Sequence, residues 1–172
     1  MVLAQADFEL YLTVREGVQG FSVPQPDPSQ SRGQYVSTTP LQSGKLHGLF
    51  SRIKPPMSAS GLVDYRAIAL RNKSVTDPAN VRVTLIDAMA GARYAFGFDP
   101  VGQRPYNSPI FQAQWIASPT HKPTNVTFTS GTGAPQLVTL PPNTVIVIWI
   151  QRTVLPKTPA VATDTAQIVV DA

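Results

Sequence analysis

Residues 145–150 read VIVIWI, a run that is apolar at every position. Side chains along a β-strand point alternately to opposite faces, so a strand with this sequence is apolar on both faces. Such a strand needs cover on both sides, which is typical of the central strand of a packed β-structure. Pro141 and Pro142 precede the run, and proline cannot donate to a central hydrogen-bond ladder. The strand is therefore predicted to begin just after these prolines.

Short strand patterns, separated by turn signals, recur along most of the chain. They are predicted at residues 7–15, 64–72, 81–86, 93–99, 125–129, 136–140 and 165–170. In several of them apolar and polar residues alternate, which indicates one buried face. In residues 7–15 the inward face is predicted to carry Phe8, Leu10, Leu12 and Val14. The 17 prolines and the scarcity of glutamate disfavour helices. The chain is therefore predicted to be an all-β sandwich, with the Trp149 ring buried between its sheets.

Residues 16–45 differ in character from the strand segments. Pro24, Pro26 and Pro28 alternate, and Gly, Ser and Gln fill much of the remainder. This composition favours extended backbone without a hydrogen-bond ladder. Two interpretations stay open: an extended arm laid over a neighbouring molecule, or a surface loop. The predicted organisation is an N-terminal strand and arm over residues 1–45, followed by a β-sandwich domain over residues 46–172.

Residues suited to catalysis are sparse and scattered. The chain has no cysteine, and its two histidines, His47 and His121, have no nearby acidic partner in the sequence. No motif for a metal, a phosphate or a catalytic triad is present, so no catalytic residue, no metal site and no cofactor are expected. The 14 basic residues form no basic block, and no apolar stretch of about 18 residues occurs, so neither nucleic acid nor a membrane is an expected partner.

Aromatic residues outside the strand patterns are the candidates for a contact surface. They are Tyr106, Phe111 and Trp115, and the residues 16–45 add Phe21, Val23 and Tyr35. Aromatic side chains with few charges around them suit the core of a protein–protein interface. Phe111 and Trp115 could equally plug one end of the sandwich. A third interpretation is a carbohydrate-binding module, in which Tyr106 and Trp115 stack on sugar rings.

Two further stretches carry a recognisable residue pattern. The first is a strand and the segment after its turn, with Tyr65, Arg66, Ile68, Leu70, Asn72, Asn80, Val81 and Val83. The second runs through Leu140, Pro142, Val145, Val147, Ile148, Trp149, Ile150, Arg152, Thr153 and Val154 to a final strand. These patterns resemble segments of tailed-bacteriophage virion structural proteins, and FELYLTV at residues 8–14 is similar to their opening strand.

The resemblance implies an immunoglobulin-like or fibronectin-like sandwich with a non-enzymatic role in the virion, made in the cytoplasm of the host bacterium. The expected function is capsid decoration, in which the protein cements the assembled head. A tail or baseplate subunit is the alternative. The implied partners are the major capsid protein or the tail and baseplate proteins, with further copies of the chain itself in the particle. Arg66 and Arg152 lie within strands and are expected either to pair with Asp64 or Asp164, or to face a partner.

Overall fold

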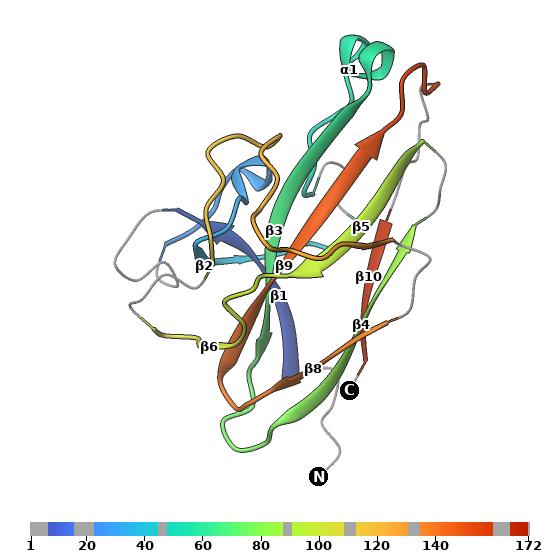
Figure 1. Ribbon diagram of the computed structural model, residues 1–172. Helices are drawn as coiled ribbons and strands as arrows, with labels where there is room; N and C mark the ends of the chain where they lie inside the picture. Colours follow the sequence, from blue (N-terminus) through green and yellow to red (C-terminus); the bar gives the residue numbers. More distant parts are fainter. Residues whose placement is uncertain are drawn as a thin grey trace.

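The structure is a computed structural model that describes residues 7–15, 23–44, 48–87, 91–108, 113–130, 135–159 and 166–171. The strands are β1 (Phe8–Val14), β2 (Tyr35–Pro40), β3 (Leu62–Asn72), β4 (Ala79–Asp87), β5 (Ala92–Phe98), β6 (Arg104–Pro105), β7 (Thr129–Ser130), β8 (Gln136–Leu140), β9 (Thr144–Val154) and β10 (Ala166–Asp171). The helical segments are the 3-10 turn η3 (Pro28–Gln30) and the short helix α1 (Pro55–Ser60). Figure 1 shows their arrangement.

The strands form two antiparallel sheets. The larger sheet has seven strands in the order β2-β1-β3-β9-β5-β7, with β6 paired to β9, and the smaller sheet has the order β10-β4-β8. Strands β3 and β9 form the central pair, in register from Leu62 opposite Val154 to Arg71 opposite Val145. The prediction of an all-β chain is confirmed, and so is the central position of the strand that contains residues 145–150.

Strand β9 is covered on both faces, as its sequence predicts. Ile146, Ile148 and Ile150 pack between the sheets against the inward side chains of β4. Val145, Val147 and Trp149 lie in a second core on the opposite face. The predicted place of Trp149 between the sheets is therefore wrong, although its side chain is fully buried. Successive side chains of β9 point to opposite faces of the larger sheet, and the smaller sheet covers the face that carries the three isoleucines.

The second core is covered by loops rather than by another sheet. Ala113, Ile116 and Val126 come from the loop segments that cover this face, and they pack with Trp149 and with Val36 of β2. This cover explains why the prediction of one buried face for residues 7–15 is wrong. Inward residues such as Leu12 are buried, but Tyr11 on the opposite face is also only 8% exposed and Thr13 is fully buried. The larger sheet is thus the middle layer, with the smaller sheet on one face and the loop segments on the other.

Residues 23–44 of the expected arm pack on their own chain. Strand β2 pairs with β1, and the Ser31 hydroxyl donates a hydrogen bond to the Ala67 carbonyl of β3. The Ser31 side chain is fully buried. Strands β1 and β2 therefore belong to the same sheet as β3, and the described part of residues 1–45 packs on that sheet. The buried Ser31 hydroxyl has hydrogen-bond partners in both β1 and β3.

The strand predicted at residues 125–129 is largely wrong. Only Thr129 enters a ladder, as part of β7. Asn125 adopts a positive φ of 56°, which an extended strand does not allow. The following residues cross over β5 at Gly97, where an added Cβ would lie 2.3 Å from the Thr127 carbonyl oxygen. This segment therefore packs on the sheet as a loop.

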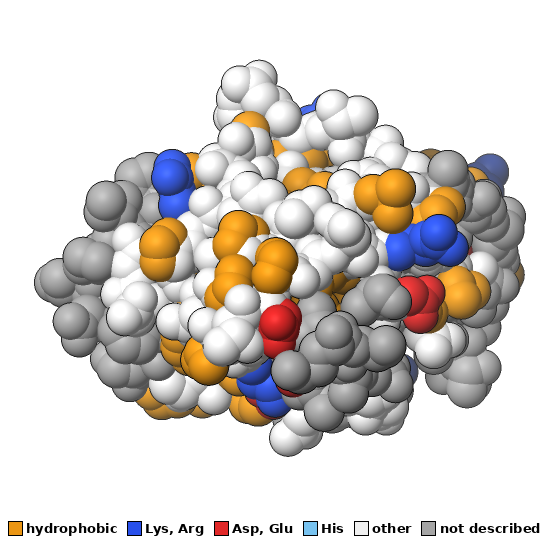
Figure 2. All heavy atoms as spheres, turned by 90° about the horizontal axis from the view of Figure 1, so that it is seen from below, with side chains coloured by type: hydrophobic (Ala, Val, Ile, Leu, Met, Phe, Trp, Pro, Cys, Tyr) orange, Lys and Arg blue, Asp and Glu red, His pale blue; other side chains and the backbone are white. Residues whose placement is uncertain are grey.

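Several large apolar side chains remain exposed away from the two cores. Leu137 of β8 is 73% exposed and Ile86 of β4 is 50% exposed, and both belong to the smaller sheet. Val75, in the turn after β3, is 79% exposed. Figure 2 views the molecule from below and shows apolar side chains in separate groups with few charged ones between them. The visible surface is thus weakly charged, in keeping with a sequence that is 14% charged residues.

Candidate functional site

A groove with a volume of about 330 Å³ lies beside Trp115, at the end of β1. Its apolar wall consists of Val14, Val23, Pro24 and Pro26. Its polar lining consists of Arg15, Gln25, Gln30 and Arg32. We call this hollow the Trp115 groove. It combines an aromatic ring, two cationic groups and an apolar wall in one place.

Two guanidinium groups lie over the Trp115 ring. The Cζ atom of Arg15 is 5.2 Å from the ring centroid, and that of Arg32 is 4.6 Å from it. Attraction between a cation and the ring face stabilises each contact. Burial lowers the pKa of Arg32, and the nearby positive charge of Arg15 lowers it further, while Asp27 opposes the shift. The groove is therefore a place of positive potential.

Backbone pairing holds Arg32 and Trp115 in place. The Ile116 N–H donates to the Arg32 carbonyl at 3.2 Å, and the Gln34 N–H donates to the Gln114 carbonyl at 3.1 Å. Gly33 sits between them with a φ of 98°, and an added Cβ there would lie 1.9 Å from the Gln114 carbonyl oxygen. Only glycine fits so close an approach in that conformation.

The Asp99 carboxylate fixes the same loop layer to the sheet. It accepts hydrogen bonds from Trp149 Nε1 at 2.8 Å and from Gln114 Nε2 at 3.2 Å. The Gln114 side chain also spans to the backbone of Thr124, accepting at 2.6 Å and donating at 3.0 Å. Because Asp99 is 3% exposed, these bonds satisfy a buried charge as well as positioning the loop. The chain segment that carries Trp115 is thus anchored to β9.

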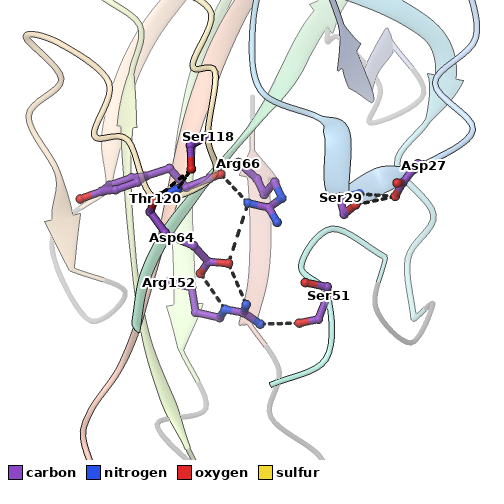
Figure 3. Close-up of polar contacts among 9 residues, drawn as sticks. Asp27, Ser29, Ser51, Asp64, Arg66, Ser118, Thr120 and Arg152 are labelled. Carbon is purple, nitrogen blue, oxygen red and sulfur yellow. Dashed lines mark hydrogen bonds and ion pairs between the residues drawn. The ribbon is translucent and has the colours of Figure 1, made fainter. Parts of the chain in front are cut away.

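A buried charge cluster forms the second concentration of polar groups. Arg152 of β9 makes a bidentate contact with Asp64 of β3, with Nε–Oδ1 at 2.9 Å and Nη2–Oδ2 at 2.8 Å. Arg66 Nη1 lies 3.8 Å from Asp64 Oδ2 and donates to the Tyr65 carbonyl at 2.8 Å. Figure 3 shows both guanidinium groups directed at the one carboxylate. The sequence-based pairing of Arg66 and Arg152 with Asp64 is confirmed.

This cluster holds two positive charges against one negative charge. Asp64, Arg66 and Arg152 are each 3–4% exposed, and the Nε atom of Arg66 has no hydrogen-bond partner. Phe50 faces both guanidinium groups, with its ring centroid 5.4 Å from Arg66 Cζ and 4.7 Å from Arg152 Cζ. Burial lowers the pKa of Arg66, which Asp64 opposes. The cluster locks the segment around Phe50 to the sheet, since Arg152 also donates to the Ser51 carbonyl at 2.9 Å.

The candidate contact residues from the sequence fall in different places. Val23 and Trp115 line the same groove. Tyr35 is the first residue of β2, opposite the groove residue Val14. Tyr106 lies apart from them, with its ring 6.3 Å from that of Tyr11 and 3.4 Å from the Arg71 guanidinium carbon. Phe21 and Phe111 lie outside the described residues.

Sequence reasoning missed the two arginines of the groove. Arg15, Arg32 and Trp115 are far apart in the sequence, and none of them belongs to a recognisable motif. The pairing of residues 32–34 with residues 113–116 brings Arg32 beside Trp115, and Arg15 joins them as the residue that follows β1. The single local signal is Gly33, whose backbone allows the close approach of the two segments.

No protein-family model, curated protein or solved structure matches the chain. Within the part of the chain that the structure describes, no helix is long and apolar enough to cross a membrane. The same described residues hold no group of three or more His, Cys, Asp or Glu side chains placed to bind a metal ion.

Proposed function

We propose that the chain is a non-enzymatic structural subunit of a tailed-phage particle, and specifically a capsid decoration protein that cements the assembled head. Its location is then the virion, its partners are the major capsid protein and further copies of itself, and it needs no cofactor. A ligand that binds only the assembled shell stabilises that shell by mass action. The Trp115 side of the molecule carries the contact.

One observation carries the proposal: the Trp115 groove brings two of the sequence-derived contact residues, Val23 and Trp115, into one preformed hollow. Tryptophan and arginine are the residue types most enriched at the energetic centres of interfaces. The hollow offers one tryptophan and two arginines beside an apolar wall.

The resemblance to virion structural proteins supports the same proposal. Its matched residues lie mainly on β3 and β9, the central pair of the larger sheet. Three of its polar members, Arg66, Asn72 and Arg152, are 0–4% exposed and hold the fold together. The resemblance therefore rests on residues that shape the framework. An immunoglobulin-like or fibronectin-like sandwich belongs to this proposal, supported by two antiparallel sheets that share one core.

The test compares phage heads with and without the protein. Heads assembled without it should lose resistance to heat and to chelators, and adding back the purified protein should restore it. The variant Leu137→Gln, which changes an exposed side chain of the smaller sheet, is the matched control and should restore stability fully. Unchanged stability of the heads that lack the protein would count against a cementing role. Immuno-electron microscopy then separates the head position from the alternative of a tail or baseplate subunit.

A carbohydrate-binding module on the virion is the second candidate, because Trp115 lines a groove. Binding on a glycan array that disappears in Trp115→Ala would favour it.

A further inference from the structure

We propose that the Trp115 groove binds an acidic, extended polypeptide segment, with a carboxylate side chain held between Arg15 and Arg32 beside the indole ring. This inference rests on the proposed function, because it names the chemistry of the contact surface. Its starting point is an imbalance of charge at the groove.

The two arginines of the groove lack a close carboxylate among the described residues. The ion pairs at 4.0 Å or less within that part of the chain involve Arg66, Lys73 and Arg152. Asp27 attracts Arg32 electrostatically without pairing with it. Two cations directed at one ring repel each other, so an anion placed between them would be stabilised by both. The groove is therefore prepared for a negative group that the described residues do not supply.

The hydrogen-bonding state of the arginines indicates which of them takes the ligand. Arg32 already donates to the Ala117 carbonyl and to Gln30 Oε1. The Arg15 side chain is exposed and makes no hydrogen bond to another described residue. A guanidinium fork matches a carboxylate with two parallel hydrogen bonds. Arg15 thus provides the hydrogen bonds, and Arg32 provides a fixed positive charge.

The remaining lining of the groove favours a polypeptide over a sugar. Gln25 Nε2 donates to the Thr13 carbonyl at 3.0 Å, and Gln25 Oε1 accepts from Asp27 N at 3.3 Å. Gln30 Oε1, the oxygen of the side-chain amide, accepts a hydrogen bond from Arg32. Both polar atoms of the Gln25 amide and the side-chain oxygen of Gln30 are thus already engaged, which leaves few amide groups to bind sugar hydroxyls. The apolar wall instead suits aliphatic residues on either side of an acidic one, and 330 Å³ is near the lower limit of ligand pockets.

The test follows the indole N–H signal of Trp115 by NMR, assigned through Trp115→Phe. The probe is the blocked peptide acetyl-Gly-Leu-Glu-Pro-Glu-Leu-Gly-amide, and its control carries glutamine in place of both glutamates. The glutamate peptide should shift the Trp115 signal and leave the buried Trp149 signal in place. Arg15→Gln should weaken binding about tenfold, as expected for loss of a charge-assisted hydrogen bond. Added salt should weaken it further.

Arg32→Gln provides a second variant, and the unchanged Trp149 signal shows whether it still folds. Leu137→Gln, on the smaller sheet, is the surface control and should bind like the unchanged protein. An equal shift with the glutamine peptide, or none at millimolar concentration, would overturn the inference. An oligoglucuronate that shifts the signal at lower concentration than the peptide would assign the groove to an acidic glycan instead.

A head-binding assay separates this inference from the proposed function. If the unchanged protein binds heads and Arg15→Gln binds them equally well, the structural role stands and the groove is not its contact. If the peptide shifts Trp115 but the protein does not bind heads, the groove's specificity stands and the role in the head fails.

Discussion

Replacing Asp64 by asparagine would leave two buried guanidinium groups without the carboxylate that faces both of them. Asparagine keeps the shape of the side chain and one acceptor oxygen, so the change removes charge with little change in volume. Breaking a buried ion pair by removing one partner costs about 3–5 kcal/mol, because the remaining charge stays desolvated. Here the remaining charge is doubled, which places the expected loss near 5 kcal/mol on that scale.

The loss should be visible in both chemical and thermal unfolding. A domain of this size loses about 2–4 °C of Tm for each kcal/mol, so Tm should fall by more than about 10 °C. Urea unfolding followed by tryptophan fluorescence gives the free energy directly, since Trp149 is fully buried. The loss should be nearly independent of salt, because the three side chains are 3–4% exposed.

Arg66→Met is the matched variant. It removes the surplus positive charge and leaves the bidentate Asp64–Arg152 pair neutral, with an apolar side chain against Phe50. Its cost should be below about 1.5 kcal/mol, since hydrophobic replacement of a buried charge is often neutral. The reasoning is refuted if Asp64→Asn unfolds within 1 kcal/mol of the unchanged protein, or if Arg66→Met is as damaging as Asp64→Asn.

Three further changes test other parts of the structure. Burial, together with the neighbouring Glu9 carboxylate, raises the pKa of Tyr11 to about 12, against 10.0 for a free tyrosine side chain. The stability that comes from its neutral form is therefore complete below pH 10 and lost between pH 10 and 12. Tm measured across that range should fall less steeply in Tyr11→Phe, and an identical slope would contradict the shift. Asn72→Ala removes a buried amide that donates to three backbone carbonyls at 3.0–3.2 Å. Urea unfolding should show that the free energy of unfolding falls by about 3 kcal/mol. A loss under about 1 kcal/mol would show that water replaces the amide. Gly33→Ala should lower Tm far more than Gly44→Ala. An added Cβ at Gly33 would collide with the Gln114 carbonyl, whereas one at Gly44 meets nothing within 4 Å. Equal effects on Tm would mean that the positive φ alone matters.

The sequence predicts the strands better than it predicts their surroundings. Periodicity locates β4 and β9 closely, because Val81, Val83 and Leu85 alternate with polar residues and residues 145–150 do not alternate at all. It does not tell which of the two faces of β9 the smaller sheet covers. Trp149 is predicted on the wrong face for that reason. Alternation with a period of two shows which residues share a face, but not which face lies between the two sheets.

The cover over the second face could not be read from periodicity because loops provide it. Thr13 appears polar and outward in the alternating pattern, yet it is fully buried under Ser31 and Gly33. Each of those contacts joins β1 to a segment about 20 residues away, and none follows a local rule. The same non-local packing creates the Trp115 groove, so the tryptophan was recognisable from the sequence and its arginines were not.

Residues 31–33 connect the two concentrations of charge in the molecule. Ser31 receives the Ala67 N–H at 2.8 Å, and Ala67 follows Arg66 of the buried cluster directly. Arg32 then enters the groove, and Gly33 donates to Thr13 Oγ1 at 2.9 Å. The backbone on both sides of Arg32 is therefore fixed to the larger sheet, so its charge is positioned before any ligand arrives. A preorganised cation loses little conformational entropy on binding. Arg32 thus provides attraction at low entropic cost, and Arg15, which makes no hydrogen bond to another described residue, provides the hydrogen bonds to the carboxylate.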